Sequence, residues 1–79
     1  MKYSITYCEQ SDGFMDKALD VYNEIKSVDE NYNIEMVVGR EGEFEVIYYE
    51  DPPALLFSRL LKGRLPKEDE IKILLMKMT

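Results

Sequence analysis

Residues 2–28 read KYSITYCEQSDGFMDKALDVYNEIKSV. In the first part of this stretch every second residue is hydrophobic, and in the later part hydrophobic residues recur every three or four positions. The alternation of Tyr3, Ile5 and Tyr7 with polar residues predicts a β-strand that has one apolar face. From Asp12 to Val28 the spacing predicts an amphipathic helix. Its apolar face consists of Phe14, Ala18, Val21, Tyr22, Ile25 and Val28. A strand followed by a covering helix indicates an α/β domain.

The only cysteine, Cys8, falls where this strand gives way to the helix. Unpaired N–H groups and the positive end of the helix dipole favour an anion there, which would shift the thiol toward its thiolate. The acidic residues Glu9, Asp12 and Asp16 oppose that shift, because like charge disfavours a thiolate. Ser11 stands where a second cysteine would complete a Cys-x-x-Cys pair; it is able to cap the helix but not to form a disulfide. A reactive thiol and an inert, buried one therefore both stay open.

Composition limits the class of protein. The chain has 79 residues with no repeat, low-complexity tract or linker, so we expect a single domain over residues 1–79. A net charge of −6 and the absence of histidine argue against nucleic acid and against anionic membrane surfaces as partners. No apolar stretch is long enough to span a bilayer or to act as a signal peptide, and a lone cysteine fits a reducing compartment. We therefore expect a cytoplasmic protein.

A row of carboxylates follows the exposed side of the first helix. Asp12, Asp16, Asp20 and Glu24 are spaced four residues apart. Such a row could attract a divalent cation, but it lacks the looped cage of oxygen ligands that calcium sites use. A solvated helix face is the better interpretation, and we expect no metal and no resident cofactor.

Two further strands are predicted at residues 34–38 and 43–49. The segment Gly39-Arg40-Glu41-Gly42 turns the chain between them, and both glycines suit a positive φ. Pro52 and Pro53 end the later strand, because proline cannot donate to a strand ladder.

The apolar run from Ala54 to Leu61 is ambiguous. Asp51 as a cap, Pro52 near the first helical position and Gly63 at the end favour a short helix, whereas the length of the run also suits a buried strand.

The last element is a predicted amphipathic helix that Pro66 opens. Acidic residues fill its first turn, where they complement the helix dipole. These acidic residues are Glu68, Asp69 and Glu70, and the apolar stripe is Ile71, Leu74, Leu75 and Met78.

Four short motifs occur in the order found in one known family. They are Tyr7-Cys8 with Ser11 three residues after the cysteine, Gly42-Glu43-Phe44-Glu45-Val46, Leu55-Leu56-Phe57-Ser58-Arg59, and Gly63-Arg64-Leu65-Pro66. Together they resemble the selenoprotein W-like family, the Rdx group of thioredoxin-like proteins. Its members typically carry Tyr-Cys-x-x-Cys or Cys-x-x-selenocysteine, then Gly-x-Phe-Glu-Val, then an apolar-Ser-Arg strand that leads to Gly-Arg-Phe-Pro. Nearly the whole chain is covered by this resemblance.

The resemblance implies a two-layer α/β domain with the order β-α-β-β-β-α, in which two helices pack mainly on one face of a mixed four-stranded sheet. It also implies that residues 54–60 form a strand. In this topology the Gly39–Gly42 loop passes over the strand end that carries Cys8, and Arg40 could be the cation beside the thiol. A plain hairpin between the second and third strands is the competing geometry.

Three functions follow from the resemblance and from its main departure, the serine at position 11. In the first, Cys8 is a single-thiol redox centre that forms mixed disulfides with glutathione or a partner protein, while Ser11 caps the helix and hydrogen-bonds the sulfur. In the second, the domain has lost catalysis and binds a partner through the open sheet face and aromatic residues such as Tyr48 or Tyr49. In the third, two such thiols and glutathione hold an iron–sulfur cluster across a dimer, although soft-metal sites favour several thiolates and each chain supplies one. The oligomeric state does not follow from the sequence.

Overall fold

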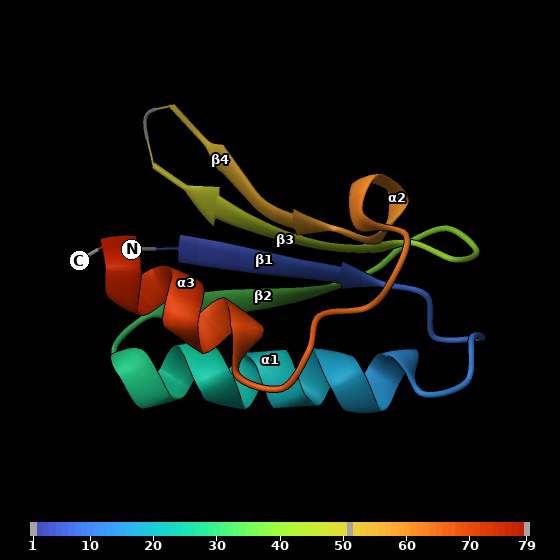
Figure 1. Ribbon diagram of the computed structural model, residues 1–79, viewed down its shortest axis with the longest axis horizontal. Helices are drawn as coiled ribbons and strands as arrows, with labels where there is room; N and C mark the ends of the chain where they lie inside the picture. Colours follow the sequence, from blue (N-terminus) through green and yellow to red (C-terminus); the bar gives the residue numbers. More distant parts are fainter. Residues whose placement is uncertain (1, 51, 79) are drawn as a thin grey trace.

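The computed structural model describes residues 2–50 and 52–78, and within them the predicted α/β arrangement is confirmed (Figure 1). The elements are β1 (Lys2–Tyr7), α1 (Phe14–Val28), β2 (Asn33–Val38), β3 (Phe44–Tyr49), β4 (Ala54–Ser58), α2 (Arg59–Lys62) and α3 (Glu70–Met78). The predicted order is present, with the short helix α2 added after β4. Asp51, which was expected to cap a helix, lies outside the described residues.

The sheet has the strand order β2-β1-β3-β4, with β2 parallel to β1 and the other neighbours antiparallel. Because β1 lies between β2 and β3, the loop that joins those two strands crosses the carboxyl end of β1. Two hydrogen bonds fix this crossing: Gly39 N–H donates to the Tyr7 carbonyl at 2.8 Å, and Cys8 N–H donates to the Glu43 carbonyl at 3.0 Å. The crossover prediction is confirmed, and the hairpin alternative is wrong.

The core lies between the sheet and the two longer helices, α1 and α3, which pack side by side on one face (Figure 1). Ile5, Val46 and Phe57 face one another across three strands and are almost completely buried. The ring of Phe44 meets Phe14 and Phe57 edge-on, with centroids 6.3 and 6.4 Å apart, so aromatic contacts join α1 to β4 through β3.

The opposite sheet face carries mixed polar and apolar side chains and includes Glu35, Ile47 and Tyr49. Tyr48 does not belong to it, contrary to the second functional interpretation. It lies opposite Tyr3 on the helix-covered side, with the two ring centroids 5.0 Å apart. The reason is the alternation of strand residues, which places neighbours on opposite faces, so of these two tyrosines only Tyr49 is on the open face.

The predicted boundaries of α1, β4 and α3 shift, and β2 and β3 each begin one residue away from the predicted start. Helix α1 begins at Phe14 rather than Asp12, because Gly13 precedes it with a φ of 81°. Strand β4 ends at Ser58, two residues before the predicted end, and α2 follows as one helical turn that ends at Gly63. The strand alternative is therefore confirmed for residues 54–58, and a helix that starts near Pro52 is wrong, although Gly63 does end a helical turn.

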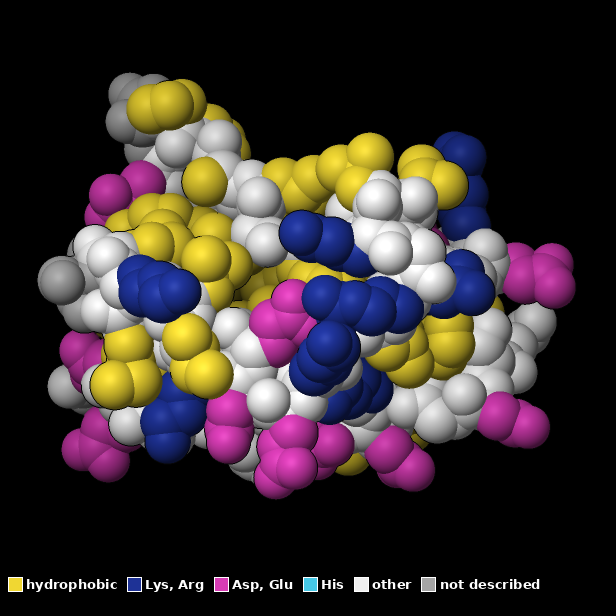
Figure 2. All heavy atoms as spheres, in the orientation of Figure 1, with side chains coloured by type: hydrophobic (Ala, Val, Ile, Leu, Met, Phe, Trp, Pro, Cys, Tyr) yellow, Lys and Arg dark blue, Asp and Glu magenta, His cyan; other side chains and the backbone are white. Residues whose placement is uncertain are grey.

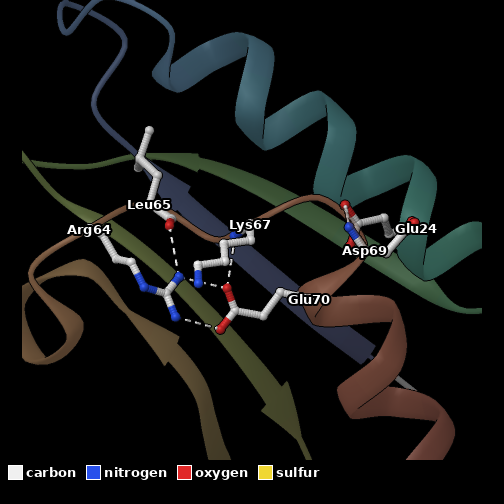
Figure 3. Close-up of polar contacts among 6 residues, drawn as sticks. All are labelled: Glu24, Arg64, Leu65, Lys67, Asp69 and Glu70. Carbon is white, nitrogen blue, oxygen red and sulfur yellow. Dashed lines mark hydrogen bonds and ion pairs between the residues drawn. The ribbon is translucent and has the colours of Figure 1, made fainter.

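Helix α3 begins at Glu70, not near Pro66 as predicted, because Asp69 has a φ of 62° and interrupts the helical backbone. The Glu24 carboxylate of α1 caps this start: it accepts a hydrogen bond from the backbone N–H of Asp69 at 3.3 Å (Figure 3). It also accepts the backbone N–H of Lys72 at 3.2 Å. The interpretation of the carboxylate row as a solvated face is therefore wrong for Glu24.

One feature of α3 differs from the sequence prediction, and one contact at its start was not predicted. Met78 is 46% exposed and does not continue the stripe of buried residues. Arg64, in the segment before the helix, forms a two-pronged pair with Glu70, with N–O distances of 2.7 and 3.0 Å (Figure 3).

Candidate functional site

The candidate site is built around Cys8, the first residue after β1. The crossing loop brings Gly42 and Glu43 against it, since Cys8 N–H bonds the carbonyl of Glu43. The residue is only 3% exposed. Reaction with a disulfide therefore requires the residues that cover Cys8 to move.

Ser11 contacts the thiol directly. Its hydroxyl donates a hydrogen bond to Cys8 Sγ, with Oγ 3.2 Å from the sulfur. The expected helix cap is different, because Gly13 occupies the cap position and no side chain bonds the helix start. The Ser11 carbonyl, rather than its side chain, accepts the N–H of Phe14 at 3.2 Å. The side chain of Ser11 is thus committed to the sulfur.

Hydrogen bonds lower the pKa of the Cys8 thiol. The largest cause is the Ser11 hydroxyl, followed by the backbone N–H of Gly42, and the N–H groups of Gln10 and Ser11 add to the effect. Burial raises the pKa and partly opposes them. The thiolate is therefore stabilised by nearby hydrogen-bond donors, and the helix dipole invoked from the sequence is not needed to explain the shift.

Arg40, predicted as the cation beside the thiol, is exposed and is not among the causes of the pKa shift. Its backbone N–H donates to the Glu43 carboxylate at 2.8 Å. The cation that bonds this loop through its side chain is Arg59: Nη1 donates to the Gly42 carbonyl at 3.1 Å, and the guanidinium lies 5.4 Å from the centre of the Phe14 ring. Sequence reasoning missed this role, although Arg59 belongs to the Ser-Arg motif.

The two glycines of the crossing loop have different functions. Gly42 has a φ of 75°, as predicted, but Gly39 does not lie in the positive region, and that prediction is wrong. What Gly39 provides is space, because a Cβ there would lie 2.6 Å from Thr6 Cγ2 and would collide with the Glu43 carboxylate. The loop passes over the end of β1 at this distance only with glycine.

Two other features are absent from the described residues, 2–50 and 52–78. These residues contain no group of three or more His, Cys, Asp or Glu side chains placed to hold a metal ion. None of their helices has the length and apolar character that crossing a membrane requires.

Comparison with known proteins gives consistent results. The sequence model of the Rdx family matches residues 2–77. A solved protein from Bordetella parapertussis is 20% identical, with a TM-score of 0.76, and the match covers 99% of this chain and 96% of that one. A selenoprotein W-related protein from Vibrio cholerae is 17% identical, with a TM-score of 0.75 and coverages of 98% and 94%. No curated protein matches the chain at a significant level. The thioredoxin-like fold predicted from the motifs is confirmed by these two structures.

Proposed function

Because this chain belongs to the Rdx family, we propose that it is a single-thiol redox protein in which Cys8 forms mixed disulfides with glutathione or with a partner protein. The observation that carries the proposal is the hydrogen bond from Ser11 Oγ to Cys8 Sγ at 3.2 Å, which stabilises a thiolate at the position of the family's redox motif. A cytoplasmic location fits this chemistry, because free thiols persist in a reducing compartment.

The proposed reaction has two steps. The Cys8 thiolate attacks one sulfur of a disulfide, a new S–S bond forms to Cys8, and the other sulfur leaves as a thiolate that takes a proton from solvent. An external thiol, such as glutathione, loses its proton and attacks the mixed disulfide, which releases the Cys8 thiolate and leaves the external sulfur bonded to the substrate. In sum the protein exchanges partners between a disulfide and a thiol. The resolving thiol has to come from outside, because Cys8 is the only cysteine in the chain.

Ser11 has two roles in this proposal. Its hydroxyl stabilises the attacking thiolate, and the same bond stabilises the thiolate again when it leaves in the second step. The Arg59 side chain is a positioning group, since it holds the carbonyl of Gly42, whose N–H also lowers the pKa of the thiol.

The test is the rate of Cys8 alkylation as a function of pH, followed by mass spectrometry after incubation with oxidised glutathione. We expect an apparent thiol pKa below the free-cysteine value of about 8.5 and an adduct one glutathione heavier than the protein. The Cys8→Ser variant is the control for labelling elsewhere. A thiol with an ordinary or raised pKa that forms no adduct would contradict the proposal.

A second function is favoured by one observation, the burial of Cys8. A thiol that is 3% exposed is also compatible with a thioredoxin-like domain that binds a protein without redox chemistry. Leu60 and Leu61 on α2 are 89% and 74% exposed near the same end of the sheet, and exposed leucines of this kind suit protein contacts. The alkylation experiment separates the two functions, because only the redox function requires a reactive sulfur.

A further inference from the structure

A groove of about 460 Å³ lies between β4 and α3, away from the loop that bonds Cys8. Its apolar lining comes from Leu56 and Phe57 on β4 and from Ile71, Ile73 and Leu74 on α3. Phe57 and Ile71 are buried, Leu56 and Leu74 are half-buried, and Ile73 is 50% exposed. The groove therefore presents apolar surface that no part of the described chain covers completely.

The rim of the groove is basic, although the chain as a whole has a net charge of −6. Four cationic side chains line it, against two carboxylates. The four cations are Lys62, Arg64, Lys67 and Lys77, and the carboxylates are Glu68 and Glu70. Figure 2 shows Lys and Arg side chains gathered at the middle of this face, next to hydrophobic atoms. Positive charge is thus concentrated at one place on an acidic protein.

The lining carries a net positive charge, and three of its four cations form no salt bridge among the described residues. Arg64 and Glu70 pair with each other, and Glu70 also accepts the backbone N–H of Lys67 at 2.7 Å (Figure 3). Among the salt bridges of the described residues, none involves the side chains of Lys62, Lys67 or Lys77. The three ammonium groups are available to an anionic ligand that enters the groove.

We propose that this groove binds an acidic segment of a partner protein, in which aspartate or glutamate residues flank one or two large apolar side chains. The apolar side chains would cover Leu56, Ile73 and Leu74, and the carboxylates would meet the three lysines. A protein segment fits better than a small molecule, because the hollow is open along the surface in Figure 2 and does not enclose a compact ligand. The inference is independent of thiol chemistry at Cys8.

The test starts from full-length protein carrying Cys8→Ser, which prevents capture through a disulfide. A phage library of random peptides is selected on this protein, and enriched sequences are synthesised with a fluorescent label and measured by anisotropy. We expect enrichment of Asp or Glu next to Leu, Ile or Phe, together with an affinity that falls as ionic strength rises. In ¹⁵N–¹H spectra the shifted amides should cluster at Phe57, Arg64 and Leu74. Wild-type protein should bind the same peptides equally well.

Charge reversal sharpens the test. The double variant Lys67→Glu with Lys77→Glu should weaken peptide binding by about tenfold or more, while its thermal melt stays close to that of the parent, since both lysines are exposed. Lys17→Glu, on α1 outside the groove, is the matched control and should change affinity by less than about twofold.

Several results would overturn the proposal. These are the absence of enrichment, enrichment of neutral or basic peptides, amide shifts centred on the Cys8 loop, and an equal loss of binding in the Lys17 control. Sedimentation of the free protein tests whether a second copy of the chain occupies the groove. A dimer that dissociates in the double variant would assign the groove to that second copy and overturn the proposal. Failure of the redox proposal would leave all of these readouts unchanged.

Discussion

The hydroxyl of Ser11 donates a hydrogen bond to the sulfur of Cys8, with Oγ and Sγ 3.2 Å apart. The serine thus lies where the redox motif of the family has its second sulfur or selenium, and it contacts the first. A serine hydroxyl cannot form a disulfide with Cys8, but it donates a hydrogen bond to the sulfur. The acidic neighbours Glu9 and Asp12 are exposed, so water screens their repulsion of a thiolate.

Ser11→Ala should raise the pKa of Cys8, because it removes the largest of the interactions that lower it. This hydrogen bond favours the charged thiolate, so without it we expect the alkylation profile to move to higher pH. The measurement is the pH dependence of alkylation by iodoacetamide. Ser27→Ala, on the exposed side of α1, is the control and should leave the profile unchanged. A Ser11→Ala profile that matches wild type would show that the hydroxyl does not tune the thiol.

Ser11→Cys should restore a Cys-x-x-Cys pair that closes readily. The two side chains already meet across the turn after β1, and disulfides form without backbone movement only where side chains are so placed. After mild oxidation, mass spectrometry should find the variant lighter by two hydrogens and unreactive toward alkylating reagents until it is reduced. An oxidised variant that forms only intermolecular disulfides would mean that the turn has lost the geometry of the motif.

The sequence predicted the elements whose signal is repeated along the chain. Alternation in β1 and the three-to-four spacing in α1 arise because many residues share one buried face, so an error at one position does not hide the pattern. The contact between Cys8 and Ser11 was also predictable, since the two are three residues apart in a recognised motif. The catalytic role of this pair stays a prediction.

What the sequence did not predict are single contacts between distant residues. Glu24 caps a helix that starts about 45 positions later, and Arg59 bonds the carbonyl of Gly42, 17 positions before it. Neither contact leaves a periodic signal, because each depends on how two elements come together in the folded chain. The close approach of Gly39 to Thr6 also depends on how two elements come together. The sequence alone therefore predicts a positive φ for Gly39 and does not reveal that the residue is needed because it has no Cβ.

Gly39→Ala should destabilise the fold without altering any charge. The added Cβ would lie 2.6 Å from Thr6 Cγ2 and would push the Glu43 carboxylate away from the N–H of Arg40. We expect a loss of about 1–3 kcal/mol in the free energy of unfolding, measured by urea denaturation. Thr6→Ser removes the Cγ2 group and should recover part of this loss when it is combined with Gly39→Ala. If the effects of the two substitutions on the free energy of unfolding are simply additive, the Cγ2 group of Thr6 is not what requires glycine at position 39.

Ile25→Ala tests the buried face of α1. Ile25 is fully buried, so truncation leaves a cavity between the helix and the sheet and should cost about 2–5 kcal/mol. Leu19→Ala on the same helix is the control, because Leu19 is 50% exposed and its loss should change stability by only about 0.5 kcal/mol. Equal effects of the two substitutions in denaturant titrations would contradict the assigned helix face.

The Arg64–Glu70 pair should make stability depend on pH in the acid range. The two-pronged bond from Arg64 and the N–H of Lys67 lower the pKa of the Glu70 carboxyl to about 2. The unfolded chain has a value of about 4.3, so the pair contributes its full stability above that pH and loses it as the pH falls toward 2.

We therefore expect Glu70→Gln to lower the free energy of unfolding by about 1–2 kcal/mol near pH 7, a range reduced from that of a buried pair because both side chains are partly exposed. The difference from wild type should shrink to less than about half near pH 2, since the wild-type carboxyl then also becomes protonated. Glu68→Gln removes a neighbouring exposed carboxylate that lacks this bond, and it should change stability little at either pH. A Glu70→Gln deficit that stays constant from neutral to acid pH would mean that the glutamate acts through its shape and packing, and that its charge contributes nothing to the start of α3.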